Sequence, residues 1–422
     1  MESILFKNIR ITDGTKDGVG DVLIEDGEIK NIIRGLTAPA DRVIDGGNGR
    51  LAMIPGLFDM HVHFRDPGQT HKEDILTGCS AALAGGVTGV ACMPNTDPPI
   101  DNIDTVQYIT KKAKVTGVGV YPVGCITQRM EGRELYAWAN LGVKMISDDG
   151  RPVENAELMR KALEHSTSNG LLVASHCEDL AIINGGIINK GEVSEKLGVP
   201  GMDRASEDNM TAREIGLAES AGARVHICHV STKGSVEIIR EAKKRGVKVT
   251  CETCPHYFTY TEQKLLSMDA DYRMNPPLRT EEDRAAIIEG LMDGTIDCIV
   301  TDHAPHTKNE KADFLKAPNG VVGLETSLAV TLTQLYHTKK LSLKRIVQLM
   351  SVNPRKLLRI PVPALERGAR AEIAVVDLAR EWEVVPDKLH SKSRNTAFKG
   401  ETLMGKNVMT ISNGRIRYDC LK

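Results

Sequence analysis

The sequence predicts an α/β protein in which a (β/α)8 TIM-like barrel is accompanied by a small β-sandwich domain formed by both termini. Three observations predict this class. Eight short apolar segments alternate with helix-like segments in the middle of the chain, β-rich segments lie at both ends, and 422 residues suffice for one large and one small domain. We expect residues 1–53 and 361–422 to form the small β domain and residues 54–360 to form the barrel.

Both ends of the chain carry strand patterns and turn signals. Near the N-terminus, strands are expected at residues 4–11, 21–25 and 28–34, and Asp26-Gly27 is a strong hairpin signal. Near the C-terminus, residues 371–377 alternate between apolar and polar types, and a hairpin is expected around Asn413-Gly414. The simplest packing brings the two ends together beside the barrel.

The middle of the chain alternates between strand and helix patterns. The helical segments carry an apolar stripe at a period of 3.6 residues, for example residues 73–85, 155–169, 207–221, 235–245 and 281–292. Strands are predicted at residues 58–63, 87–93, 118–123, 143–147, 171–176, 224–229, 247–252 and 296–302. A doubly wound open sheet is the structural alternative. The first strand is not followed by a convincing G-x-G-x-x-G, which counts against a dinucleotide-binding version.

Composition excludes several function classes. The 54 Lys and Arg residues nearly balance the 56 Asp and Glu residues, so we expect no partnership with nucleic acid or with an anionic membrane surface. No apolar run reaches the ~18 residues that a membrane span needs, and the N-terminus lacks a signal-peptide pattern. A cytoplasmic protein is therefore expected. The nine cysteines do not resemble a disulfide framework.

Polar side chains recur where the predicted strands end. His61 and His63 end the first strand, His176 the fifth and His229 the sixth, while carboxylates follow the fourth and eighth strands at positions 148, 149 and 302. In a parallel barrel these ends meet at one mouth, where four imidazoles and two carboxylates could hold two divalent cations. The alternative is that each histidine is an ordinary rim residue.

Alternation along the strands predicts which neighbours take no part. His226 lies three residues before His229, so we expect its side chain on the opposite face, in a structural role. Cys177 and Cys228 should likewise point away from the metals. Cys251 and Cys254 form a C-x-x-C, but no second pair lies at zinc-finger spacing, so neither a redox nor a zinc role is expected.

The motifs as a whole resemble those of the amidohydrolase superfamily, and specifically the longer, bacterial-type class I dihydroorotase family. The resemblance covers nearly the whole chain. The segments that narrow it to this family are R-D-P-G at 65–68, M-P-N-T at 93–96 and N-P-P-L-R at 275–279; H-x-H at 61–63 and D-H at 302–303 indicate only the superfamily.

This resemblance implies the reversible conversion of N-carbamoyl-L-aspartate to L-dihydroorotate in de novo pyrimidine (UMP) biosynthesis. It also implies two Zn²⁺ ions per subunit. His61, His63 and Asp302 would hold one ion, His176 and His229 the other, and Asp149 would bridge them. Lys144 and Asp148 are alternative bridges, since many relatives use a carbamylated lysine at the end of the fourth strand, the strand in which Lys144 lies. Asp302 would also be the catalytic acid and base.

The substrate carries a carboxylate, and the planar fork of Arg65 suits such a group. A salt bridge with Asp66 is the alternative role for Arg65. By resemblance, further substrate contacts come from His63, Asn95, Asn275, His306, Asn319 and Gly320. Residues 308–320 are expected to form a mobile lid over this pocket.

Two other functions are consistent with the sequence. The segment 252–257 resembles that of allantoinase, dihydropyrimidinase and hydantoinase relatives, which are sister cyclic amidases. A non-catalytic, dihydroorotase-like assembly partner would have lost ligands, and none is lost here. The resemblance further implies a homodimer and association with other pyrimidine enzymes.

Overall fold

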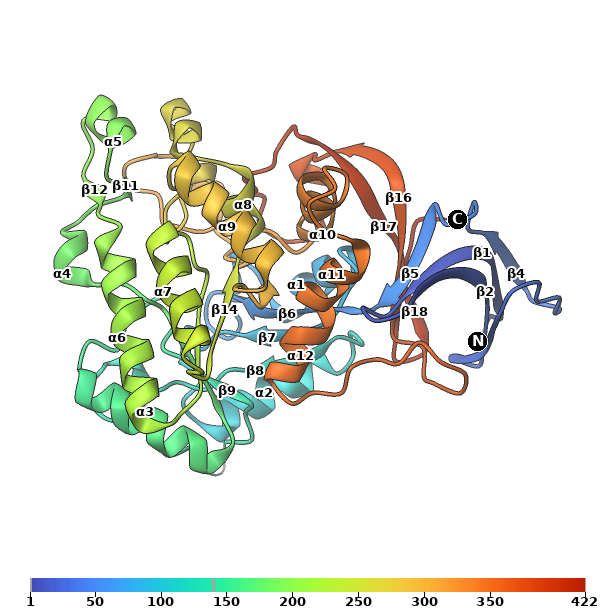
Figure 1. The fold of residues 1–422 in the computed structure, drawn as a ribbon, viewed down its shortest axis with the longest axis horizontal. Helices are drawn as coiled ribbons and strands as arrows, with labels where there is room; N and C mark the ends of the chain where they lie inside the picture. Colours follow the sequence, from blue (N-terminus) through green and yellow to red (C-terminus); the bar gives the residue numbers. More distant parts are fainter. Residues whose placement is uncertain (1, 139–140, 422) are drawn as a thin grey trace.

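The structure is a computed structural model, which describes residues 2–138 and 141–421. Strands from both ends of the chain lie side by side in one eight-stranded sheet, at the end of the molecule where the blue and red segments meet (Figure 1). Its order is β18-β17-β16-β5-β1-β2-β3, with β4 paired to β1. The strands are β1 (Ile4–Thr12), β2 (Asp17–Glu25), β3 (Glu28–Ile33), β4 (Arg42–Asp45), β5 (Leu51–Pro55), β16 (Ile373–Glu383), β17 (Thr402–Ser412) and β18 (Arg415–Asp419).

Both hairpins predicted in this sheet are present. Glu25 pairs with Glu28 across Asp26-Gly27, and Ser412 pairs with Arg415 across Asn413-Gly414. All four turn residues have positive φ, between 49° and 76°, as a type I′ turn requires.

Each of the eight strands predicted in the middle of the chain is also observed. They are β6 (Leu57–Val62), β7 (Val87–Cys92), β8 (Gly119–Pro122), β9 (Met145–Ile146), β10 (Leu172–Ser175), β13 (Val225–Ile227), β14 (Val249–Thr253) and β15 (Cys298–Ile299). All their pairings are parallel. They form two sheets, β6-β7-β8 and β9-β10-β13-β14-β15, with strands in consecutive order, so the order reversal of a doubly wound sheet is absent from the described residues.

Isolated parallel bridges connect these two sheets on both sides. Gly124 pairs with Ile146 next to β8 and β9, and Val62 pairs with His303 next to β6 and β15.

Helices follow most of the strands and lie outside them (Figure 1). The helices are α1 (Ile75–Ala84), α2 (Ile103–Ala113), α3 (Ala156–Asn169), α4 (Leu180–Ile183), α5 (Glu192–Leu197), α6 (Ala205–Ala221), α7 (Lys233–Lys244), α8 (Pro255–Thr259), α9 (Glu281–Asp293), α10 (Ser327–Thr331), α11 (Leu343–Val347) and α12 (Asn353–Leu357), and a short pair, β11 (Ile188–Asn189) and β12 (Gly201–Met202), precedes α6.

Local sequence explains where the helices begin and end. The Asp74 side chain accepts hydrogen bonds from the N–H groups of Leu76 and Thr77 and so caps α1. At the other end of α1, a Cβ at Gly85 would lie 2.0 Å from the carbonyl oxygen of Leu324, so only glycine fits there. None of the described helices combines the length and apolar character that crossing a lipid bilayer requires.

Buried apolar side chains form two clusters that meet at β5, β16 and β17. Ile54 and Val376 belong to the cluster around the parallel strands, while Met53 and Val375 belong to the cluster enclosed by the terminal sheet. Alternation along a strand places successive side chains on opposite faces, so this part of the terminal sheet packs on both sides.

Candidate active site

The six candidate metal ligands lie together, although they come from five separate strand ends. His61 is the last residue but one of β6 and His63 directly follows this strand, while Asp149, His176, His229 and Asp302 lie just beyond β9, β10, β13 and β15. All six side chains are buried. Their ligand atoms form two groups, each with all atoms within 4.8 Å of one another: His61, His63 and Asp302 in one, and Asp149, His176 and His229 in the other. Parallel strands bring these distant residues to one rim.

Asp149 lies between the two groups. Its Oδ2 atom is 3.3 Å from Nε2 of both His61 and His63. Its Oδ1 atom is 3.5 Å from Nδ1 of His176 and 3.4 Å from Nε2 of His229. Burial opposes ionisation, but the surrounding imidazoles hold the pKa of Asp149 well below its usual range. Asp149 is therefore an anion that faces all four histidines.

The alternative bridging residues are not at this cluster. The Lys144 side chain is exposed to solvent. Asp148 is buried, but its Oδ1 atom accepts hydrogen bonds from the backbone N–H groups of Ile126 and Thr127, at 2.8 and 3.2 Å. Of the three candidates, only Asp149 contacts both groups of ligands.

The donor set fits divalent cations. Nε2 of His61 and Oδ1 of Asp149 are buried without a hydrogen-bond partner in the described part of the chain, which is costly for polar atoms unless something else binds them. Four imidazoles and two carboxylates are ligands that zinc and similar metals prefer. The residues present thus suit a metal cofactor.

Arg65 is a buried cation beside this cluster. Its side chain lies near the carbonyl oxygen of Pro305 and Nε2 of His306, both at 3.4 Å, and among the described residues no carboxylate lies within ion-pair distance of it. Burial lowers the pKa of Arg65. Asp66 instead pairs with Lys112 at 2.6 Å, so the alternative Arg65–Asp66 salt bridge does not form. A buried guanidinium of this kind needs an anionic partner.

Of the two predicted amide residues, Asn95 contacts a histidine directly and Asn275 is linked to one through Glu178. Oδ1 of Asn95 is 2.7 Å from Nδ1 of His63. Asn275 donates from Nδ2 to Oε1 of Glu178 at 2.8 Å, and Oε2 of Glu178 is 3.2 Å from Nε2 of His176. Asn95 and Asn275 therefore approach the cluster from different sides.

The remaining predicted contacts form one loop structure next to Arg65. Nε2 of His306 lies 2.9 Å from the carbonyl oxygen of Asn319. Gly320 has a φ of +140°, and a Cβ there would lie 2.7 Å from the carbonyl oxygen of Ala304. Burial, with the positive charges of Arg65 and Lys72, lowers the pKa of His306 to about 3, so its imidazole is neutral near neutral pH.

Comparisons with known proteins identify the family of this chain. The model of the amidohydrolase family matches residues 52–417. The chain belongs to the amidohydrolase family. It is 48% identical to a dihydroorotase of Trichlorobacter lovleyi, with 98% of this chain and 99% of the relative covered, and 49% identical to a dihydroorotase of Geobacter sp. strain M21, with 99% of both covered.

Solved structures of the family have the same architecture. The L-hydantoinase (dihydropyrimidinase) of Arthrobacter aurescens superposes with a TM-score of 0.86 at 25% identity, and 99% of this chain and 96% of that chain are covered. A D-hydantoinase superposes with a TM-score of 0.83 at 24% identity, over 99% of this chain and 95% of that one, which supports the fold alone. This amidohydrolase therefore has a TIM-barrel-like α/β fold.

Two residues of this amidohydrolase that contact the cluster were missed in the sequence. Oε1 of Glu252 lies 2.5 Å from Nδ1 of His61, and Oε2 lies 3.1 Å from Nε2 of His226. His61 and His226 counteract the effect of burial and lower the pKa of Glu252 to about 2. Glu178, next to His176, is the second. The only sequence signal for Glu178 was its position two residues after His176, a candidate ligand.

Two predictions about orientation were wrong. His226 shares the inner face with Glu252 instead of pointing to the opposite face. The Cys228 thiol lies within 4.8 Å of the ligand atoms of His61 and Asp149 instead of pointing away. The reason is that β13 ends at Ile227 and His229 has a φ of +32°, which breaks the alternation on which both predictions depended. Cys177 does point away, since its sulfur lies against Ser175.

The proposed lid, residues 308–320, is tied to the rest of the domain. The buried Lys311 ammonium group donates to the carbonyl oxygens of Arg273, Pro318 and Gly320, at 3.0 to 3.1 Å.

Cys251 and Cys254, the C-x-x-C pair, are free and buried, and burial raises the pKa of both thiols.

Proposed function

We propose that this chain is a zinc-dependent dihydroorotase, which converts N-carbamoyl-L-aspartate to L-dihydroorotate and back in pyrimidine biosynthesis. The observation that carries this proposal is the buried Arg65 guanidinium, which lacks a carboxylate partner in the described structure and lies beside the two groups of His and Asp ligands. The substrate and the product each carry the carboxylate that such a site needs. The dihydroorotase relatives of nearly full coverage support the same reaction.

We assign the ligands as the geometry groups them. His61, His63 and Asp302 would hold one Zn²⁺, His176 and His229 the second, and Asp149 would bridge them. Bound cations would polarise the ring amide carbonyl and lower the pKa of water, which makes a nucleophile available at neutral pH.

Asp302 is the proposed proton carrier. Its Oδ1 atom lies 3.0 Å from Nε2 of His63. Burial opposes ionisation, but His63 and His61 keep the pKa of Asp302 below its usual value, so its carboxylate can accept a proton from the attacking water. Asp302 then delivers this proton to the ring nitrogen that leaves, and in cyclisation the transfers run in reverse.

The proposed substrate contacts orient the ring. Arg65 binds the carboxylate, and Asn95, Asn275 and His306 offer polar groups around it, with the backbone of Asn319 and Gly320 closing the pocket. His63 contacts both Asn95 and Asp302, so it joins the substrate side to the ligand side.

Steady-state assays in both directions, together with metal analysis, test this function. We expect turnover of carbamoyl-aspartate and dihydroorotate, about two zinc ions per chain, and loss of activity with a chelator that added zinc reverses. Chelator-resistant activity would contradict the metal assignment, and absence of turnover at full zinc occupancy would contradict the reaction.

A sister cyclic amidase is the second candidate, because the hydantoinase structures superpose over nearly the whole chain. A substrate panel with hydantoin, dihydrouracil and allantoin separates the two. A site built around Arg65 should prefer dihydroorotate by a factor on the order of 10⁴, since rings without a carboxylate leave the guanidinium unpaired.

We also infer the finer architecture. The consecutive strand order and the two connecting bridges support a closed (β/α)8 barrel at residues 54–360. The separate apolar cluster of the terminal sheet supports a β-sandwich-like domain at residues 1–53 and 361–422. A cytoplasmic homodimer and association with other pyrimidine enzymes are proposals from the family resemblance alone, and light scattering after gel filtration measures the oligomeric state.

A further inference from the structure

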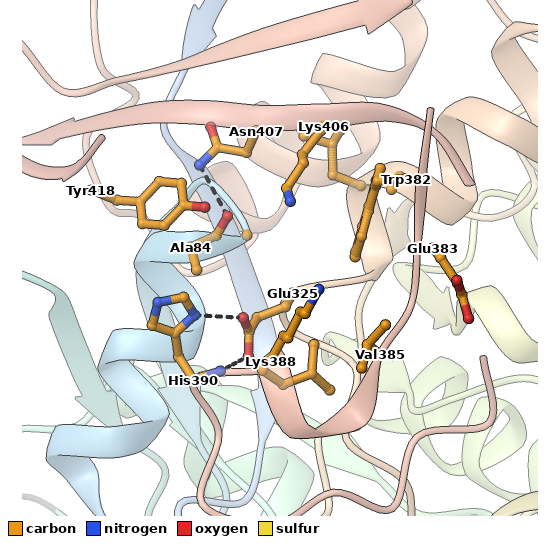
Figure 2. Close-up of a pocket in the computed structure, with 14 residues that line it drawn as sticks. Ala84, Glu325, Trp382, Glu383, Val385, Lys388, His390, Lys406, Asn407 and Tyr418 are labelled. Atoms are coloured by element: carbon orange, nitrogen blue, oxygen red, sulfur yellow. Dashed lines mark hydrogen bonds and ion pairs between the residues drawn. The ribbon is translucent and has the colours of Figure 1, made fainter. Parts of the chain in front are cut away.

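A cavity of about 270 Å³ lies where the terminal sheet packs against the barrel helices (Figure 2). Its walls come from the C-terminal end of α1, the start of α10, and strands β16, β17 and β18. None of the six candidate metal ligands and none of the proposed substrate contacts lines it. The cavity is therefore a place separate from the active site.

Two lysines give this cavity a positive character. Lys406 and Lys388 reach toward its centre in Figure 2, and neither forms an ion pair with a carboxylate among the described residues. Burial lowers the pKa of Lys406, and the positive charges of Arg380 and Lys388 lower it further, while the Glu325 carboxylate partly opposes this shift. Positive charges this close together repel one another unless an anion lies between them.

Among the described residues, no acidic side chain of the wall forms an ion pair with these lysines, although the charge of Glu325 partly offsets that of Lys406. Glu325 is bound by His390, whose Nδ1 atom lies 2.8 Å from Oε2 and whose backbone N–H donates to Oε1 at 2.6 Å. This contact raises the pKa of His390. Glu383 is exposed and lies at the edge of the view, away from the two lysines (Figure 2).

Aromatic side chains complete the wall. The Lys406 ammonium group lies 4.6 Å from the centre of the Trp382 ring, and Tyr418 lies on the other side of the cavity (Figure 2). The volume is slightly below that of most drug-sized ligand sites, which range from about 300 to 1,000 Å³. A compact molecule with one charged group and a ring fits such a space.

We propose that this cavity binds a small organic anion, a phosphate or carboxylate on a compact ring, with Lys406 and Lys388 at the anionic group and Trp382 beside the ring. Because the wall combines barrel helices with terminal strands, the bound anion would hold the two parts together. This inference does not depend on the reaction proposed above.

Direct binding to the intact protein tests the proposal. The probes are uridine 5′-monophosphate, inorganic phosphate and uridine, which separate the anionic group from the ring, and calorimetry gives each Kd. We expect the monophosphate to bind more tightly than phosphate and uridine not to bind. Equal affinity for the monophosphate and phosphate would identify free phosphate as the ligand. If uridine binds as well as the monophosphate, or if no probe binds, the proposal is wrong.

Fluorescence locates the bound probe. The chain has two tryptophans, and Trp138 does not line the cavity. We expect the monophosphate to change the emission of the wild type but not of Trp382→Phe, while calorimetry still detects binding to that variant. Binding should also persist in Arg65→Met, which removes the anion contact of the active site. Loss of binding in Arg65→Met would place the probe in the active site and overturn the proposal.

Two lysine substitutions and one control complete the design. Lys406→Met and Lys388→Met should each weaken binding by about 10-fold, since each removes one charge-assisted hydrogen bond. Lys308→Met is the control, because Lys308 is, like Lys388, exposed and without an ion pair in the described structure but lines a different cavity. Equal weakening in all three variants would reveal only non-specific attraction. Unchanged melting temperatures without ligand would show that each variant folds.

Discussion

At the scale of single residues, the contact between Glu252 and His61 determines how the candidate metal ligand His61 is oriented. The two residues are 191 positions apart, and the carboxylate lies against Nδ1 of the imidazole. This contact directs Nε2 of His61 toward Asp149 and leaves its lone pair for a cation. Sequence patterns pointed to the candidate ligands because these residues stand at strand ends, but Glu252 lies inside a strand, where alternation alone does not distinguish a site residue from a core residue.

Asp302→Asn should lower turnover by about 10²–10⁴-fold with little change in folding, because the amide cannot carry the proton and is a weaker ligand. The measurements are kcat for dihydroorotate and thermal unfolding. Asp148→Asn is the matched control, since this neighbouring carboxylate of the rim accepts backbone hydrogen bonds but is not at the cluster. Near-normal turnover in Asp302→Asn would remove this residue from the mechanism.

Arg65→Met should reduce kcat/KM for dihydroorotate far more than for dihydrouracil, which has no carboxylate. The expected loss is about 10²-fold or more for the charged ring, since one bidentate charge-assisted contact disappears. Competing the two substrates in one assay measures the ratio directly. Equal losses for both rings would mean that Arg65 has only an architectural role.

His306 gives the protein a sensitivity to acid. Its pKa is about 3 in the folded chain, below the ordinary value of 6.5 in the unfolded chain, so the unfolded state binds more protons between these values. The stability that the neutral imidazole contributes is complete above pH 6.5 and is lost as the pH falls toward 3. Urea unfolding at pH 7.5 and at pH 5 measures this effect. Between these two pH values, the free energy of unfolding of His306→Gln should fall by about 1–2 kcal/mol less than that of the wild type. An identical pH dependence would contradict this account.

At the scale of elements, the site is predictable where the chain follows regular alternation and unpredictable where it departs from it. Because parallel strands end at the same rim, we expected the residues at these five strand ends to lie together. The early end of β13 at Ile227 reversed the directions expected for His226 and Cys228, and no sequence signal marks that irregularity. The C-terminal segment offered no signal either, although one of its residues supports the substrate pocket.

That residue is Asn395. Its side chain is buried, accepts from the backbone N–H of His306 at 3.1 Å, and donates to the carbonyl oxygens of Gly320 at 3.0 Å and Ala304 at 3.3 Å. Asn395→Ala should raise KM for dihydroorotate by about 10-fold and lower kcat less, because the loop that faces Arg65 loses its support. Lys392→Ala, at an exposed position nearby, is the control. A change in stability with unchanged KM would make Asn395 purely structural.

At the scale of the whole molecule, the sequence predicted that the two ends of the chain meet, because both carry strand patterns. It did not predict that they share one sheet, or that this sheet has apolar side chains on both faces of β5, β16 and β17. Strand order between distant segments depends on long-range packing, and a local pattern contains no information about it.

Asn407 joins the sheet to the barrel helices. Its buried Nδ2 atom donates to the carbonyl oxygens of Leu83 and Ala84 at the end of α1, at 3.2 and 3.1 Å. Asn407→Ala should lower the free energy of unfolding by about 1–3 kcal/mol, because the Ala84 carbonyl loses its side-chain donor and the Leu83 carbonyl keeps only Thr410 and a backbone N–H as donors, while kcat should stay within about twofold. Urea unfolding and the standard assay measure both, with Asn31→Ala in the same sheet as the control. Unchanged stability would show that α1 does not need this cap.

The shared terminal sheet also has a consequence for synthesis on the ribosome. β5 pairs with β1 on one side and with β16 on the other, and Arg50 beside it bonds to Asp377, 327 residues later. A nascent chain therefore carries an open strand edge while nearly the whole barrel is translated. Ribosomes that stop before β16 would release chains with that edge exposed, and such truncated chains should aggregate or be degraded even when every residue of the catalytic centre has already been made.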